Sequence, residues 1–156
     1  MMVEKWEPVL RDVISEVLET MFFSMVEFEE EGEGHGFDYG SGIDIFNHNG
    51  RMEISLRVSR EFARTITANL LGVNEDQVVE EDLEDTLKEF TNMVGGSYHA
   101  RMKNSEWCLG IPRAWKIAPT GEAPVHSGGG EVHFGCFGES MGSALLEFIP
   151  ETVQPC

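Results

Sequence analysis

The stretch LEDTLKEFTNMVGGSY, from Leu83 to Tyr98, has the apolar period of an α-helix and decides the fold class. Apolar side chains recur in it at steps of three and four, which gathers them on one side at about 100° per residue. The residues of this apolar face are Leu83, Leu87, Phe90, Val94 and Tyr98. The pattern predicts a helix of about five turns that reaches Lys103 and packs this face on a core.

The opposite face of the same helix carries polar side chains and a glycine. Its residues are Asp85, Glu89, Asn92, Gly96 and His99. Glu89 and Asn92 are three residues apart, so a carboxylate and a carboxamide are neighbours there and can enter one partner cleft together. A glycine inside a helix costs about 1 kcal/mol relative to alanine, so Gly96 requires an explanation, and close approach of another backbone is one. On spacing alone, an ordinary solvent-exposed polar face is the more common explanation, since most E-x-x-N pairs on helices are such residues.

Two more helices are expected before this one. Apolar spacing predicts a helix over 9–26, with Pro8 in its first turn. A shorter helix should begin after a cap at Ser59 and end at Gly72, which can adopt the left-handed conformation that stops a helix.

The rest of the chain is expected to form strands and loops. The first two strands flank the turn Asn47–Gly50 as a hairpin. The predicted strands are 43–46, 52–58, 113–118, 131–137 and 142–149. Residues 27–39 and 120–130 are rich in glycine and have no apolar period, so both are expected to be loops. The sequence therefore predicts one α+β domain over 1–156.

The first and third helices can be aligned with an offset of 73 residues, so that Leu10 falls on Leu83. This alignment predicts an internal repeat of about 9–58 and 82–149. Any two amphipathic helices can be slid into such a match, so the alignment alone leaves a true duplication open.

The charge of the chain excludes several kinds of partner. Its 28 acidic and 11 basic residues give a net charge of −17, which repels phosphate backbones and anionic lipids. We therefore expect neither nucleic acid nor a membrane surface as a partner. Without an apolar export segment or a membrane span, the protein is expected in the cytoplasm.

The cysteines and the acidic loop do not predict a catalytic or metal site. Cys108, Cys136 and Cys156 are odd in number and widely spaced, which fits a reducing cytoplasm. Cys108 and Cys136 read as small buried apolar residues. The acidic segment around His35 does not match an EF-hand loop, and Gly128–Gly130 lacks the lysine of a phosphate-binding loop.

The decapeptide LKEFTNMVGG, from Leu87 to Gly96, resembles the signature of the CheC/CheX chemotaxis phosphatases, in which E-x-x-N is followed by glycine. The stretch from Ser59 to Gly72 resembles that family's second helix, and Leu109–Pro112 resembles its strand leading to a proline. The resemblance covers nearly the whole chain, most specifically 59–112. It implies a pseudo-symmetric fold with long helices packed on an antiparallel sheet.

The resemblance also implies a substrate and a mechanism. The substrate is the aspartyl phosphate of a CheY-like receiver domain in two-component signalling. By this resemblance Glu89 pairs with the receiver's lysine, and Asn92 orients water for in-line attack on phosphorus. Gly96, Asp85 and His99 are expected to border the partner. Mg²⁺ should belong to the receiver's acidic pocket, and this chain needs no cofactor or metal of its own.

The repeat has one E-x-x-N site where CheC-like members have two. Glu16 corresponds to Glu89, but Glu19 takes the place of Asn92, and Phe23 that of Gly96. This is the CheX-like pattern, which also implies a homodimer. The alternative is a non-catalytic domain of the same fold that binds a receiver or a flagellar-switch partner.

Overall fold

The computed structural model describes residues 6–22, 25–29, 37–48, 50–103, 106–117, 132–136 and 140–150. The helices are α1 (Trp6–Met21), α2 (Arg60–Leu71) and α3 (Glu80–Met102), with a short 3-10 helix η2 (Glu75–Gln77). The strands are β1 (Val26–Glu29), β2 (Tyr39–Asn47), β3 (Gly50–Val58), β4 (Cys108–Leu109), β5 (Arg113–Lys116), β6 (Val132–Cys136) and β7 (Ser140–Pro150).

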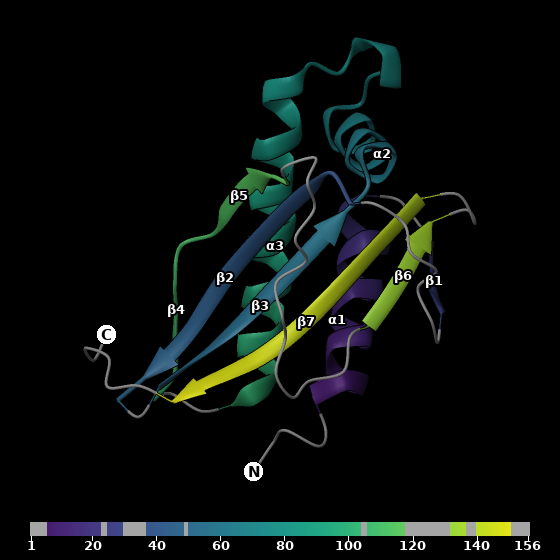
Figure 1. Cartoon of the computed structure of the whole chain (residues 1–156). Coiled ribbons are helices and arrows are strands. Elements are labelled where there is room, and N and C mark those ends of the chain that lie inside the picture. Colours follow the sequence, from purple (N-terminus) through teal and green to yellow (C-terminus); the bar gives the residue numbers. More distant parts are fainter. Residues whose placement is uncertain are drawn as a thin grey trace.

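All these strands belong to one antiparallel sheet, so the predicted α+β class is confirmed. The strand order is β1-β6-β7-β3-β2-β4, and β5 also pairs with β2. The helices cover one face of this sheet: α1 and α3 lie side by side across it, and α2 crosses one end (Figure 1). None of the described helices has the length and apolarity needed to cross a membrane.

Alternation along β3 explains which face of the sheet is covered. Met52, Ile54, Leu56 and Val58 are buried, whereas the residues between them are half-buried. Successive strand residues point to opposite faces, so the buried set faces the helices. Above it, the ring of Phe90 on α3 packs 5.5 Å from that of Phe22 and 6.1 Å from that of Phe62 on α2, centroid to centroid.

The local signals for α2 and the hairpin are confirmed. The side chain of Ser59 accepts a hydrogen bond from the Phe62 N–H at 3.1 Å, and Gly72 closes the helix with a φ of 69°. Asn47 pairs with Gly50 at the turn between β2 and β3. The third helix ends at Met102, and Lys103 follows in the left-handed conformation.

Three predictions for the first third of the chain are wrong. α1 ends at Met21, not at Val26, and the expected loop 27–39 contains residues 27–29 of β1, which pairs with β6. Val26 and Phe28 alternate with glutamates, which is a strand pattern that the acidic composition concealed. β2 also begins at Tyr39, earlier than expected, although Gly40 and Gly42 are poor strand formers.

The later strands match their predictions closely, with ends that differ by one or two residues. β5 covers Arg113–Lys116, β6 covers Val132–Cys136 and β7 covers Ser140–Pro150. The expected loop 120–130 lies outside the described residues. Leu109, where the resemblance implied a strand leading to a proline, lies in β4.

The strand order is symmetric about the pair of β3 and β7. The hairpin β2–β3 contributes β3 to the centre, and the hairpin β6–β7 contributes β7. Outside them, β4 from the second half of the chain pairs with β2, and β1 from the first half pairs with β6. A duplication would produce this order. The internal repeat itself stays a prediction.

Candidate functional site

Residues just before and just after Asn92 along the chain hold α3 against the sheet. One residue earlier, the hydroxyl of Thr91 donates to the Ser41 Oγ on β2 at 2.6 Å, and both residues are buried. Three residues later, a Cβ atom added at Gly95 would lie 2.7 Å from Cγ2 of Ile43. At this point α3 lies so close to β2 that only glycine, which has no Cβ atom, fits without a shift of its neighbours.

The outward face of α3 is the one predicted from its period. Asp85 and Glu89 are exposed, Asn92 is half-buried, and the apolar residues of the helix are buried on the other side. Within the part of the chain that the structure describes, the side chains of Glu89 and Asn92 make no hydrogen bond or ion pair. A carboxylate and an amide are therefore available together to an outside partner.

Gly96 lies on this outward face, but the close approach within the chain belongs to Gly95. A Cβ atom at Gly96 would meet Leu109 Cδ2 at 3.8 Å, which is an ordinary contact. Sequence reasoning missed Gly95, although its position four residues after Thr91 places it on the side that faces β2. An approach of a partner's backbone to Gly96 stays a prediction.

His99 holds the segment that follows α3. Its Nε2 lies 2.6 Å from the carbonyl oxygen of Trp107, and because a carbonyl accepts, the ring nitrogen donates. This bond ties the last turns of the helix to the chain just before β4. The expected contact of His99 with a partner stays a prediction.

β4 borders the outward face and differs from expectation at Cys108. Cys108 is half-buried and is disulfide-bonded, although the sequence led us to expect a buried apolar thiol. The odd number and wide spacing of the cysteines gave no signal for this bond, and the bond does not fit the reducing compartment inferred from them.

The strongest electrostatic cluster lies at the N-terminal end of α3. The Glu80 carboxylate accepts a hydrogen bond from the Tyr39 hydroxyl and pairs with Arg60 at 2.8 Å and Lys116 at 3.1 Å. The Tyr39 bond, followed by Lys116 and Arg60, lowers the pKa of Glu80 to about 2. Burial, followed by the bond to Glu80, raises the pKa of Tyr39 to about 12. Neither group titrates near neutral pH, so at that pH the hydrogen bond and ion pairs of Glu80 hold the first turn of α3 to β2, α2 and β5.

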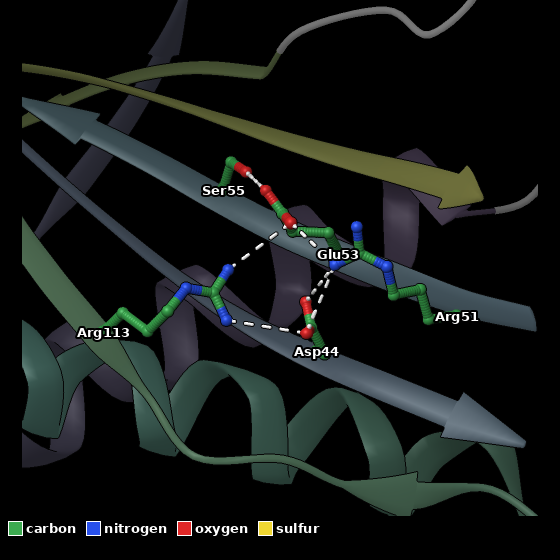
Figure 2. A network of polar contacts seen from close by, with 5 residues as sticks. All are labelled: Asp44, Arg51, Glu53, Ser55 and Arg113. Carbon is green, nitrogen blue, oxygen red and sulfur yellow. Dashed lines mark hydrogen bonds and ion pairs between the residues drawn. The ribbon is translucent and has the colours of Figure 1, made fainter. Parts of the chain in front are cut away.

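A second charged cluster lies on the sheet face away from the helices (Figure 2). Asp44 and Glu53 are directly opposite each other on β2 and β3, where two carboxylates repel. Arg51 Nη1 lies 3.3 Å from Asp44 Oδ1 and 3.4 Å from Glu53 Oε2, and Arg113 Nη2 lies 3.4 Å from Glu53 Oε2. The two arginines thus balance the two carboxylates, so the cluster reads as an ion-pair network.

Metal ligation finds no support in the described residues. They contain no group of three or more His, Cys, Asp or Glu side chains that could hold an ion.

Solved structures share this fold over nearly the whole chain. The chemotaxis protein CheX of Vibrio vulnificus is 18% identical, with a TM-score of 0.77 over 93% of this chain and 97% of its own. A CheX–CheY–BeF3–Mg²⁺ complex from Borrelia burgdorferi is 16% identical, with a TM-score of 0.74 over 94% and 98%. The FliM–SpeE complex of H. pylori matches at 13% identity and a TM-score of 0.60 over 96% and 88%.

At these identities the likeness establishes the fold alone. No curated protein matches the sequence. The family model described as chemotaxis phosphatase CheX, however, matches residues 41–129, which is more than half of the chain and includes most of β2 and all of β3, α2 and α3. The chain therefore belongs to the CheX family of chemotaxis phosphatases.

Proposed function

We propose that this protein removes the phosphoryl group from the aspartyl phosphate of a CheY-like receiver domain. The observation that carries the proposal is the pair Glu89 and Asn92. Both project from one face of α3, and neither side chain has a partner among the described residues. Membership of a phosphatase family and likeness to a CheX that was solved with CheY support the same function.

Glu89 serves as the docking carboxylate in this proposal. An exposed carboxylate attracts the ammonium group of a receiver lysine, and the pair fixes how the receiver sits on α3. Asn92 lies about one helical turn further along. Docking through Glu89 therefore brings the amide to the phosphoryl group.

Asn92 orients the water that attacks phosphorus. The new bond joins the water oxygen to phosphorus, the bond from phosphorus to the aspartyl oxygen breaks, and the carboxylate leaves with its electron pair. The hydrogens of the water remain on the inorganic phosphate that is released. An acyl phosphate has a good leaving group, so positioning supplies much of the acceleration. An amide donates and accepts hydrogen bonds without adding a negative charge beside the phosphoryl oxygens.

Mg²⁺ is assigned to the receiver rather than to this chain. Mg²⁺ is commonly held by carboxylates and phosphate oxygens together, and the Borrelia complex contains Mg²⁺ along with CheY and BeF3. The receiver's acidic pocket would supply the carboxylates, and α3 would supply neutral Asn92 opposite them.

One active surface per chain is proposed. In α1 the counterpart of Glu89 is Glu16, which forms an ion pair with Arg101 of α3, and Glu19 stands where Asn92 would be needed. The first helix therefore offers no amide to orient water. A homodimer and a cytoplasmic location are part of the same proposal.

The test is a dephosphorylation assay with purified protein and a phosphorylated CheY-like receiver. Asn92→Ala should abolish the acceleration and change the free energy of unfolding by less than about 1 kcal/mol, because the side chain is outside the core. Glu19→Ala is the matched control and should leave the rate nearly unchanged. Near wild-type activity in Asn92→Ala would refute the mechanism, and equal losses in both variants would mean that the repeat also carries a site.

The same assay separates catalysis from binding alone. A domain like the flagellar-switch relatives would bind the receiver without shortening the lifetime of its phosphate. Binding without acceleration in the wild-type protein would favour that alternative.

A further inference from the structure

We propose that Ile111, at the sheet edge that adjoins the Asn92–Gly95 turn of α3, is an apolar contact for the docked receiver and helps to set its affinity. This inference rests on the proposed function, because it names a further part of the same docking surface. Ile111 is 83% exposed, the highest fraction among the exposed large apolar residues that the structure describes.

Ile111 belongs to a bulge between two edge strands. On one side of it Leu109 pairs with Ile45, and on the other Arg113 pairs with Gly42. Three edge residues, 110–112, therefore face only Ile43 and Asp44 of β2. A bulge redirects its side chains and ends regular pairing, which leaves Ile111 outside the ladder.

The bulge lies beside the part of α3 that carries Asn92. Ile43, which faces the bulge on β2, is the residue that a Cβ atom at Gly95 would meet. Leu109, two residues before Ile111, borders both Gly95 and Gly96, at 3.3 Å and 3.8 Å from their added Cβ atoms. The bulge that carries Ile111 therefore adjoins the helical turn from Asn92 to Gly95.

The backbone around Ile111 is held before any partner arrives. The N–H of Gly110 donates to the Asp44 carbonyl at 2.7 Å. A Cβ atom at Gly110 would lie 3.0 Å from the same oxygen, so the segment is pressed against β2. Pro112 on the other side has a fixed φ. Little backbone entropy remains to be lost on docking, which favours affinity.

The surface so formed suits a folded receiver that presents a cation next to an apolar patch. Glu89 and Asp85 supply negative charge, Asn92 supplies the polar group, and Ile111 supplies apolar area at the edge of the sheet. Single exposed apolar residues are common on protein surfaces. This one differs because a fixed backbone holds it next to the turn of α3 that begins at Asn92.

The test compares Ile111→Ser with Met25→Ser, a control of similar kind. Met25 is 70% exposed and precedes β1, the opposite edge strand. Affinity is measured by calorimetric titration of each variant with a BeF3-activated CheY-like receiver, and KM and kcat by dephosphorylation of the phosphorylated receiver. Circular dichroism checks that both variants fold.

Ile111→Ser should weaken receiver binding by about 5- to 20-fold, as expected for losing one buried aliphatic contact. KM should rise in proportion, while kcat at saturating receiver stays within about twofold, because Asn92 is untouched. Ile111→Val should lie between wild type and Ile111→Ser, and Met25→Ser should match wild type.

Unchanged affinity and KM in Ile111→Ser would overturn the inference. A wild-type protein that binds the receiver without accelerating hydrolysis would overturn the phosphatase proposal alone, since the titration still measures the contribution of Ile111. A wild-type protein that binds no CheY-like receiver would overturn both.

Discussion

The hydroxyl of Thr91 and the hydroxyl of Ser41 share a 2.6 Å hydrogen bond in the interior, one residue before Asn92. Removing either hydroxyl should destabilise the protein by about 1–3 kcal/mol, because the other loses its buried partner. Thr91→Val keeps the shape of the side chain, and Ser41→Ala removes the acceptor. We expect the double variant to lose less than the sum of the two, as measured by urea unfolding. Additive losses would show that the bond does not couple α3 to β2.

The neighbouring glycines of α3 should respond oppositely to alanine. Gly96→Ala should stabilise the protein by up to about 1 kcal/mol, because the new methyl group has room and alanine favours the helix. Gly95→Ala should destabilise it by about 1–3 kcal/mol, since the methyl group would overlap Ile43 on a rigid strand. Thermal unfolding of the pair measures both, and equal melting temperatures would contradict the close approach at Gly95.

Leucine at position 96 tests the docking face itself. Gly96→Leu should fold, because position 96 points outward, but its side chain should obstruct a receiver that approaches Glu89 and Asn92. We expect weaker receiver binding and a matching fall in dephosphorylation at low receiver concentration. Gly96→Ala is the control for the loss of glycine. If titration gave the same receiver affinity for both variants, the docking face would have to lie elsewhere.

The Glu80 cluster should make stability depend on pH in acid. The folded pKa of Glu80, about 2, is below its usual value of 4.5. The contribution of the ionised Glu80 carboxylate to the free energy of unfolding is therefore complete above pH 4.5 and is lost as pH falls toward 2. The difference in unfolding free energy between wild type and Glu80→Gln should shrink from pH 6 to pH 3.

Glu81→Gln is the matched control for that series. Glu81 is the next residue of α3, is exposed, and makes no ion pair with the rest of the described chain. A wild-type minus Glu80→Gln difference that stays constant over the same pH range would contradict the lowered pKa.

Features with local causes could be predicted from the sequence. The cap at Ser59, the stop at Gly72 and the two faces of α3 each depend on residues within a few turns of one helix. β1 was missed because its partner, β6, is more than a hundred residues away along the chain, so no signal within the segment itself indicated the pairing.

The Glu80 cluster could not be predicted for a similar reason. Its members come from β2, α2, α3 and β5, which the fold alone brings together. At the candidate site, the pattern of α3 placed Glu89 and Asn92 outward. It could not show which glycine touches β2, because that depends on how the helix is rotated against Ile43.

The central position of β7 also determines the order in which the molecule can assemble. β7 pairs with β3 over nine residue pairs and with β6 on its other side, so β1 and β6 join the rest of the sheet through it. Because β7 follows β3 by some eighty residues, a long loop must close before the sheet becomes continuous, which slows folding. During synthesis on the ribosome, β3 emerges well before β7 and keeps an unpaired edge that can bind other chains. A nascent chain of this protein should therefore depend on protection from aggregation until its last strand has been made.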